Sequence, residues 1–422
     1  MFEKERKYKY VNLKALPGGA PEKEYAASVA ALPYDVMNSD EAREMVKGNP
    51  YSFLHVDKAE IDLPSGTDIY DDSVYEKAKE NLLCLEDSGA LVQDKSNCFY
   101  IYRQVMNGRA QTGIAGCASI DDYMNNVIKK HEHTLAKKEV DRIRHVDTCD
   151  ANTGPIFLTY RKNNHINDIV NAWIRNHEPV YNFTSDGVLQ TVWVVDDSEA
   201  VAELSSLFET VPFMYIADGH HRCASAVKVG QMRREAKADY TGEEEFNFFL
   251  AVAFPDEELE IMDYNRVVRD LNGLSVDEFI SVLSDKFIVT KQSERYKPAK
   301  KHTFGMLIKN QWYSLEAKDK ILNDVDPIER LDVSMLQENI LSPILNITDP
   351  KNDDRIDFIG GIRGLSELEK RTSTDMELAF AMYPTTVEDL MAIADADLIM
   401  PPKSTWFEPK LLSGLFIHHL TD

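Results

Sequence analysis

The order of apolar and polar residues along the chain predicts short strands that alternate with amphipathic helices. In the first half, apolar runs at 97–106 and 112–120 indicate strands, and the segment 120–131 that follows has apolar side chains on one helical face. The apolar positions of this segment recur at i, i+3, i+7 and i+8, namely Ile120, Tyr123, Val127 and Ile128. Ser119, three residues before Asp122, supplies a start that resembles a capping box. We therefore expect a helix over 120–131 that carries the polar run 129–134 at its C-terminal end.

The clearest unit is a strand, a polar turn and a helix between residues 211 and 238. The apolar run 211–217 predicts a short buried strand, and 223–238 consists of good helix formers with basic residues late in the segment. The turn between them is made of five polar residues, Asp218, Gly219, His220, His221 and Arg222. A polar turn of this composition between a strand and a helix is a candidate for chemistry.

The second half of the chain continues the mixture of helices and strands. It predicts helices at 274–287, 333–345 and 386–396, a hairpin from 302–310 and 311–317, and strands at 355–361, 376–384 and 398–400. The charged stretch 240–245 separates this half from the preceding unit. We expect an α+β protein with two domains, 1–245 and 246–422, since 422 residues are more than one core usually holds.

Composition narrows the class of protein. Hydrophobic residues make up 43% and charged residues 28%, which is typical of a globular chain. The five cysteines are odd in number and widely spaced, and no run reaches the roughly 18 apolar residues of a membrane span, so a reducing cytoplasmic location without membrane contact is expected. The formal charge of −24 disfavours nucleic acid as a partner. A homo-oligomer is compatible with the sequence.

The polar turn is the strongest candidate for phosphate binding. The usual signatures of nucleotide-binding loops, zinc proteases and serine hydrolases are missing from the chain. Backbone N–H groups at a helix N-terminus attract phosphate, Gly219 permits close approach, and Arg222 has the geometry to grip an oxyanion with two N–H groups. Asp218 is a candidate for a divalent metal or a substrate hydroxyl. The plainer alternative is a turn in which Asp218 caps the helix.

Two further polar clusters are weaker candidates. Glu132 has the chemistry of a general base, although a carboxylate at a helix end is more often only solvated. Lys403, Ser404 and Thr405 follow two prolines and offer one ammonium and two hydroxyl groups, a combination that suits phosphate. The weakest candidates are Arg103 in a predicted strand, the segment 141–145 and the glycine-rich segment 360–364.

These residues resemble a known family. Asp218 to Arg222 after a short strand looks like the nucleotide-binding signature of the partition-protein and sulfiredoxin superfamily, and within it the free L-serine kinases are most similar. That family has a Pro-His-Glu sequence before the signature, where this chain has Lys130, His131 and Glu132, with Lys in place of Pro. Its C-terminal Pro-Lys-Thr-Thr loop resembles 402–405 here. The chain is much longer than the archaeal serine kinase type, which implies an insertion between Glu132 and Asp218.

The whole chain also resembles a bacterial and archaeal family of uncharacterised conserved proteins, known as domain of unknown function 1015. That family carries four phrases that recur in this chain, YIADGHHR, MDYNRVV, DFIGGIRG and IMPPKSTWFEPK. The match covers nearly the full length, but the family name implies no activity.

The serine kinase resemblance implies a small-molecule kinase that forms O-phospho-L-serine, with a partition-protein-like nucleotide-binding core and a second α+β domain. It implies Glu132 as base, with Asp218 and His220 as further catalytic residues. Donor phosphates would be held by Gly219, His221, Arg222, Lys403, Ser404 and Thr405. His131 and Arg103 are weaker candidates for substrate binding. The hypothesis is completed by Mg²⁺, for which Asp218 is a weaker candidate ligand. The phosphate donor would be ATP, ADP or pyrophosphate.

Two alternatives from other classes stay open. The first is a nucleotide-dependent sensor or switch that binds nucleotide without turnover. The second is a metal-dependent hydrolase whose ligands would come from five residues, His131, His133, Asp218, His220 and His221.

Overall fold

The computed structural model describes residues 10–134, 136–237, 239–323 and 325–421. Backbone contacts divide the chain into two units. The first runs to Leu259 and is completed by the segment from Pro409 onward, whereas the second is Glu260–Glu408. This division differs from the predicted boundary at 245, because the strand Phe248–Pro255 lies in the main sheet of the first unit.

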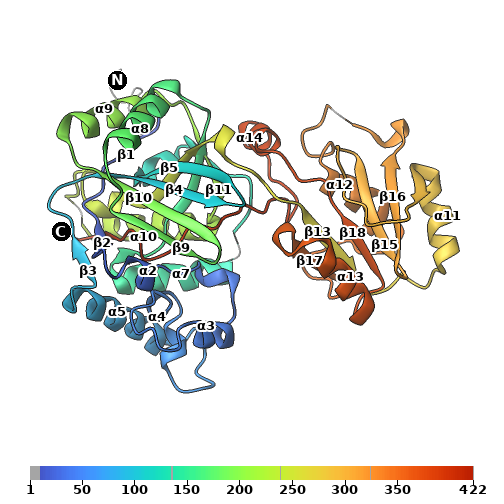
Figure 1. The fold of residues 1–422 in the computed structure, drawn as a ribbon, viewed down its shortest axis with the longest axis horizontal. Coiled ribbons are helices and arrows are strands. Elements are labelled where there is room, and N and C mark those ends of the chain that lie inside the picture. Colours follow the sequence, from blue (N-terminus) through green and yellow to red (C-terminus); the bar gives the residue numbers. More distant parts are fainter. Residues whose placement is uncertain (1–9, 135, 238, 324, 422) are drawn as a thin grey trace. The chain divides into compact units, whose positions relative to one another are not determined.

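The first unit is built on a nine-stranded mixed sheet (Figure 1). Its strands are β1 (Leu13–Lys14), β4 (Phe99–Met106), β5 (Arg109–Ser119), β6 (Ile128–Lys129), β8 (Ile156–Tyr160), β9 (Tyr181–Ser185), β10 (Val188–Val195), β11 (Met214–Asp218) and β12 (Phe248–Pro255). Their order is β6-β11-β8-β12-β5-β4-β10-β9, with β1 paired to β5. The strands β12 and β8 are parallel, whereas β5, β4 and β10 form antiparallel pairs. The sheet therefore contains both parallel and antiparallel pairs.

Helices pack on this sheet and on a smaller N-terminal layer. They are α2 (Ala26–Val29), α3 (Ser39–Met45), α4 (Leu54–Asp57), α5 (Asp72–Asp87), α6 (Ile120–Met124), α7 (Ala136–Cys149), α8 (Asn164–Asn176), α9 (Ser198–Phe208) and α10 (His220–Ala236), with short 3₁₀ turns η1 (Tyr34–Val36), η2 (Ala59–Asp62), η3 (Glu245–Asn247) and η4 (Asp256–Glu258). The helices α8, α9 and α10 bury side chains in one core with the sheet, and α3, α4 and α5 form a second core. Both cores exclude water from apolar side chains, which is the main stabilising contribution to such layers.

The predicted strand, turn and helix around residue 218 are present as β11, Gly219 and α10. Apart from Asp218, the side chains of β11 are buried, and the strand lies between β6 and β8. Small residues on α10 permit close packing, since a Cβ added at Gly230 would lie 2.4 Å from the carbonyl oxygen of Phe246. The sheet thereby fixes the start of α10 at the end of a buried strand.

The predicted helix over 120–131 is wrong beyond its first turn. Ser119 caps α6 as expected, but α6 ends at Met124 and Asn126 adopts a left-handed conformation with φ 58°. The chain then forms β6, which pairs in parallel with β11. Pairing at a sheet edge satisfies backbone groups over a segment whose side-chain spacing alone suits a helix. The polar run that follows is therefore placed beside β11 by a strand.

The segment from Pro409 onward belongs to the first unit. Its strand β19 (His418–His419) pairs with β7 (Ala151–Asn152), and Ile417 forms a bridge with Gly19 near the pair β2 (Gly19–Pro21) and β3 (Leu91–Gln93). The His418 Nε2 contacts Glu245 at 2.8 Å, and Leu420 is buried beside α7 and α10. The last described part of the chain therefore contributes to the core of the first unit.

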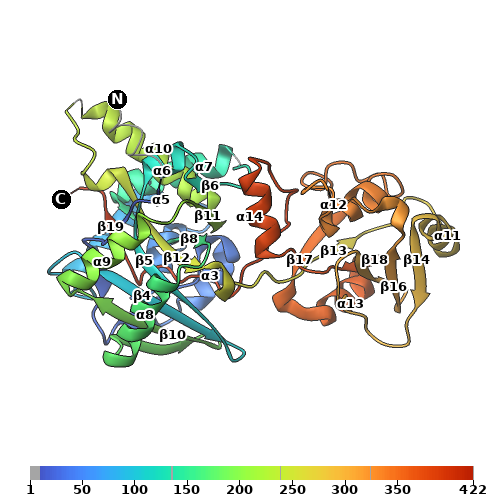
Figure 2. The ribbon, with the colours of Figure 1, turned by 90° about the horizontal axis from the view of Figure 1, so that it is seen from above.

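The second unit contains a six-stranded sheet (Figure 2). Its strands are β13 (Tyr264–Val268), β14 (Phe287–Lys291), β15 (Thr303–Ile308), β16 (Gln311–Ala317), β17 (Ile356–Gly360) and β18 (Leu378–Ala381), in the order β14-β16-β15-β18-β13-β17. Its helices are α11 (Val276–Lys286), α12 (Asp332–Leu336), α13 (Gly364–Thr374) and α14 (Val387–Asp395), with η5 (Asp319–Ile321), the π-helix η6 (Gln337–Leu341) and η7 (Gly361–Arg363). The hairpin β15–β16 and the helices α11 and α14 confirm the sequence prediction, whereas 398–400 is not a strand.

Among the described residues, no helix combines the length and the hydrophobicity that crossing a membrane requires.

Candidate active site

The site is organised by the junction between β11 and α10. Gly219 occupies the N-cap position of α10 with φ 89°, a conformation that favours glycine. Its N–H donates to Oδ1 of Asp218 at 2.8 Å. A Cβ added at Gly219 would also lie 3.2 Å from Nε of Arg222. The backbone conformation therefore favours glycine at this position, and a larger residue would also displace the side chain of Arg222 by a few tenths of an ångström.

Asp218 forms an ion pair with Lys410. The Lys410 Nζ donates to Oδ2 of Asp218 at 2.9 Å, and the carbonyl of Lys410 accepts from Nε2 of Gln104 at 2.9 Å. Burial opposes ionisation of Asp218, but the charges of Lys410 and Arg222 hold its pKa well below the usual value. Asp218 is therefore a carboxylate at neutral pH. Sequence reasoning assigned no role to Lys410, because nothing in the order of residues links it to Asp218.

Two histidines and a glutamate meet in front of this junction. The rings of His131 and His220 pack edge to face with their centroids 4.5 Å apart. The Nδ1 of His220 lies 3.8 Å from Oε2 of Glu132, whose side chain is 40% exposed. The structure therefore brings together three residues that the sequence places in two separate motifs. The parallel pairing of β6 with β11 accounts for this proximity.

Both imidazoles are buried and neutral at pH 7. Burial lowers the pKa of His131 well below its usual value, and it lowers the pKa of His220 to about 4. Among the described residues, Nε2 of His220 has no hydrogen-bond partner, whereas His131 interacts with the backbone of Ile216, which raises its pKa against the larger effect of burial. Buried polar atoms without partners are uncommon in folded proteins. The Nε2 atom of His220 can therefore hydrogen-bond a ligand, as donor or acceptor according to the tautomer of the neutral ring.

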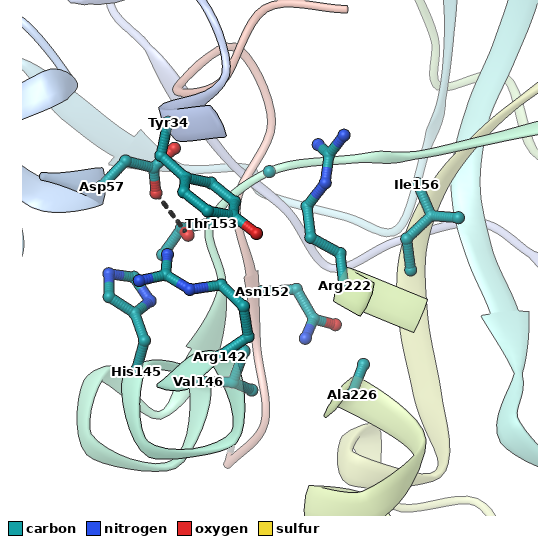
Figure 3. A pocket seen from close by; sticks show the side chains of 11 residues that line it. Tyr34, Asp57, Arg142, His145, Val146, Asn152, Thr153, Ile156, Arg222 and Ala226 are labelled. Carbon is teal, nitrogen blue, oxygen red and sulfur yellow. Dashed lines mark hydrogen bonds between the residues drawn. The ribbon is translucent and has the colours of Figure 1, made fainter. Parts of the chain in front are cut away.

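Arg222 borders a small cavity between α10 and α7 (Figure 3). Its Nη1 donates to the carbonyl of Pro155 at 2.8 Å. On the other side, the guanidinium of Arg142 lies 4.1 Å from the ring centre of Tyr34. Thr153 donates to Asp57 at 2.8 Å. The cavity measures about 30 Å³, which is room for water but not for phosphate.

The predicted magnesium ligand Asp218 is engaged in contacts within the protein. Both carboxylate oxygens of Asp218 already accept hydrogen bonds, one from Lys410 and one from Gly219. In the part of the chain that the structure describes, no group of three or more His, Cys, Asp or Glu side chains is placed to hold a metal ion. The ligand set of the hydrolase hypothesis is therefore not assembled there, and we derive no step through a metal at Asp218.

The remaining predicted residues have other surroundings. Arg103 on β4 donates to Thr112 at 3.1 Å and lies 5.5 Å from the ring of Trp193, so its contacts are within the sheet. His221 is half-buried, and burial together with the charge of Lys138 lowers its pKa. The charges that act on His221 are those of Lys138 and Glu139 on α7 and Asp35 in η1, in addition to Asp218.

The predicted loop 403–405 belongs to the second unit. Lys403 has φ 58°, and its carbonyl accepts from Nη2 of Arg266 at 2.9 Å. Ser404 is buried and donates to the carbonyl of Pro401 at 2.6 Å. Thr405 is partly exposed. The loop is thus held by contacts within its own unit.

Comparison with known proteins adds a family and distant structural similarities. The model of a family described as "Protein of unknown function (DUF1015)" matches residues 13–334. A free serine kinase variant in complex with AMP is 13% identical with a TM-score of 0.35, over 72% of this chain and 89% of that one. SbnI with a C-terminal truncation, from Staphylococcus aureus, is 10% identical with a TM-score of 0.37, and the similarity covers 71% of this chain and 85% of that one. A conserved hypothetical protein from Pyrococcus furiosus is 13% identical with a TM-score of 0.31, and the similarity covers 72% of this chain and 93% of that one. No curated protein matches the chain at a significant level.

Proposed function

The chain belongs to the DUF1015 family, and from the geometry of its site we propose that it transfers a phosphoryl group to the hydroxyl of a small metabolite. The observation that carries this proposal is the meeting of Glu132 with His220 at the start of α10. A partly exposed carboxylate, two neutral imidazoles and the ion pair of Asp218 with Lys410 then lie around one helix N-terminus. Phosphoryl transfer depends mainly on positioning and on neutralising charge, and this set of groups supplies both.

Glu132 is the proposed general base. Its side chain is 40% exposed, so an acceptor alcohol can reach it, and His220 constrains it from the buried side. The proton of the acceptor hydroxyl passes to Glu132 as the acceptor oxygen bonds to the terminal phosphorus. The bond from that phosphorus to the bridging oxygen of the donor breaks, and its electron pair stays on the departing phosphate or nucleotide. Atoms and charge are thereby balanced without a further reactant.

The donor phosphates are proposed to bind at the start of α10. The first N–H groups of this 17-residue helix have no carbonyl partner within it, and the helix dipole places positive charge there. Lys410 adds a formal positive charge next to Asp218. His220 Nε2 is available to hydrogen-bond a phosphate oxygen. Arg222 donates from Nη1 to the carbonyl of Pro155, and because a guanidinium has five N–H donors we also propose it as a ligand of the donor phosphates.

L-Serine is the first acceptor to test, and ATP, ADP and pyrophosphate are the donors to test. This choice rests on the motifs that contain Glu132 and Asp218, and not on a pocket shaped for serine. The proposal extends those motifs with Lys410, which the fold brings to Asp218 from far along the chain.

The test is phosphoserine formation by the full chain with each donor in a separate reaction, in buffers with and without added Mg²⁺. Product that appears with one donor, and that disappears in Glu132→Gln, supports transfer and names the donor. Nucleotide binding without product from any of several hydroxylated metabolites would instead support the sensor alternative. The absence of both binding and product would overturn the phosphate site itself.

A further inference from the structure

The second unit contains a cavity of about 790 Å³ that is separate from the site at Asp218. Its volume lies within the range of small-molecule sites, roughly 300–1,000 Å³. Its walls come from β13, β17, α12, the π-helix η6 and the two prolines 401 and 402. π-Helical turns are rare and occur frequently at functional sites. This cavity plays no part in the function proposed above.

Arg266 forms the inner wall of this cavity and has an unusual environment. Its residue surface is only 3% exposed, and among the described residues no carboxylate forms an ion pair with it. Its guanidinium donates to the carbonyls of Tyr264 and Lys403, and it lies 5.3 Å from the ring centre of Phe358. A guanidinium has five N–H donors, so donors remain beyond these two bonds. A buried cation without a counter-ion is costly, which favours an anion that arrives with a ligand.

Ser334 on α12 gives a second, independent observation in the same cavity. It is 6% exposed, and its Oγ has no hydrogen-bond partner among the described residues. Leaving a buried hydroxyl unpaired costs free energy unless a water or ligand satisfies it. Arg266 and Ser334 therefore both present unused hydrogen-bonding capacity to one cavity.

The acidic side chains of the cavity lie at its exposed rim. Glu329, Glu338 and Asp349 are all exposed, in contrast to Arg266 and Ser334. The exposed Lys351 also lines the cavity, so three carboxylates face one ammonium group at the mouth, whereas the charge at the buried end is positive. A ligand with an oxyanion at one end and a neutral or cationic group at the other matches this arrangement.

We propose that this cavity binds a small metabolite through an oxyanion, a carboxylate or a phosphate, that contacts Arg266 and Ser334. The opposite end of the ligand faces the acidic rim. The proposal does not rest on phosphoryl transfer at Glu132, because the two sites belong to different units and share no residue.

The test is calorimetric titration of the full chain with matched probes. Butanoate, its neutral analogue butanamide, inorganic phosphate and 4-aminobutanoate are titrated separately. We expect saturable binding of an oxyanion with one site per chain, and at least tenfold weaker binding of butanamide than of butanoate if the group is a carboxylate. Tighter binding of phosphate than of butanoate would show that the oxyanion of the ligand is a phosphate. 4-Aminobutanoate should bind more tightly than butanoate, because its ammonium faces the rim.

Four variants make the result specific. Ser334→Ala should weaken binding of the preferred probe about three- to tenfold, the effect of one lost hydrogen bond, and it removes no contact that the fold needs. Arg266→Met should abolish binding. Arg269→Met, which changes an exposed arginine on the same segment, and Glu132→Gln in the first unit should leave binding unchanged. Absence of saturable binding with every oxyanion, or equal affinity in wild type and Ser334→Ala, would overturn the proposal.

Discussion

Lys410 reaches Asp218 across 192 positions of sequence and places its ammonium 2.9 Å from the carboxylate. The pair lies directly beside the start of α10, where a phosphate donor is proposed to bind. It links the last segment of the first unit to the motif that sequence reasoning identified as the site. Substitution of either partner therefore tests both stability and function.

Removing the ammonium should destabilise the protein. Lys410→Met leaves Asp218 without its main charge partner, and because the Asp218 side chain is 34% exposed we expect a loss of about 1–3 kcal/mol. Urea unfolding measures this loss. The double variant Asp218→Asn with Lys410→Met should recover part of it, because no unpaired charge remains. If the loss of unfolding free energy in the double variant equals the sum of the losses in the two single variants, the two residues do not interact.

The contribution of His220 to stability should fall as the pH is lowered from 7 to 5. Burial lowers the pKa of His220 to about 4, so in this range the unfolded chain binds a proton that the folded chain does not. The free energy of unfolding then decreases by about 2 kcal/mol for this group, with the change beginning near its unfolded pKa of about 6.5. His131 acts in the same direction, because burial also lowers its pKa.

Chemical denaturation at pH 7 and pH 5 measures this effect, and His220→Gln supplies the comparison. The variant should lose less stability over the same interval, because it lacks the buried imidazole. An unchanged pH dependence would show that His220 is not kept neutral by burial. The depressed pKa of Asp218 stabilises the folded chain throughout this interval. This stabilisation is lost only when the pH falls below the usual carboxylate pKa of about 3.9, so it does not affect the comparison of pH 7 with pH 5.

A side chain at residue 219 should disturb both backbone and site. Gly219→Ala forces alanine to φ 89° and brings its Cβ to 3.2 Å from Nε of Arg222, so we expect destabilisation of about 1–3 kcal/mol. Gly187→Ala is a matched control, because Gly187 has φ 77° but no atom within 4 Å of an added Cβ. The thermal midpoint should fall more for Gly219→Ala. Equal shifts would assign the whole effect to the backbone conformation.

Loss of the proposed base should slow transfer without loss of donor binding. Glu132→Gln keeps the shape of the side chain, and we expect kcat to fall by about 10²–10⁴-fold, the usual contribution of a general base. Glu243→Gln, on an exposed segment, should retain full activity. Donor affinity, measured by titration, separates a defect in chemistry from a defect in binding. A fully active Glu132→Gln would exclude this residue as the base.

Local patterns in the sequence were sufficient to predict the unit from β11 to α10. A short apolar run, a polar turn with glycine and a segment of helix formers all favour the same local structure. The same holds for the hairpin β15–β16, where two apolar segments are joined by a tight turn at Lys309 and Asn310, both with positive φ. These elements depend little on the rest of the chain.

Other features depend on contacts that the order of residues does not reveal. The segment after Met124 has helical spacing, but pairing with β11 makes it a strand, and this pairing moves Glu132 beside His220. The ion pair of Asp218 with Lys410 and the cavity around Arg266 are also tertiary features. Arg266 carries no local signal, because an arginine in a strand is usually exposed and this one becomes notable only through its burial.

The return of the chain to the first unit at Pro409 has a consequence for biosynthesis. The first unit is discontinuous, with the whole of Glu260–Glu408 placed between its two parts. A ribosome that has delivered β11, α10 and β12 has not yet delivered Lys410 or β19. A nascent chain therefore holds Asp218 without its counter-ion until the second unit has emerged, and folding of the first unit is completed only after translation passes Lys410.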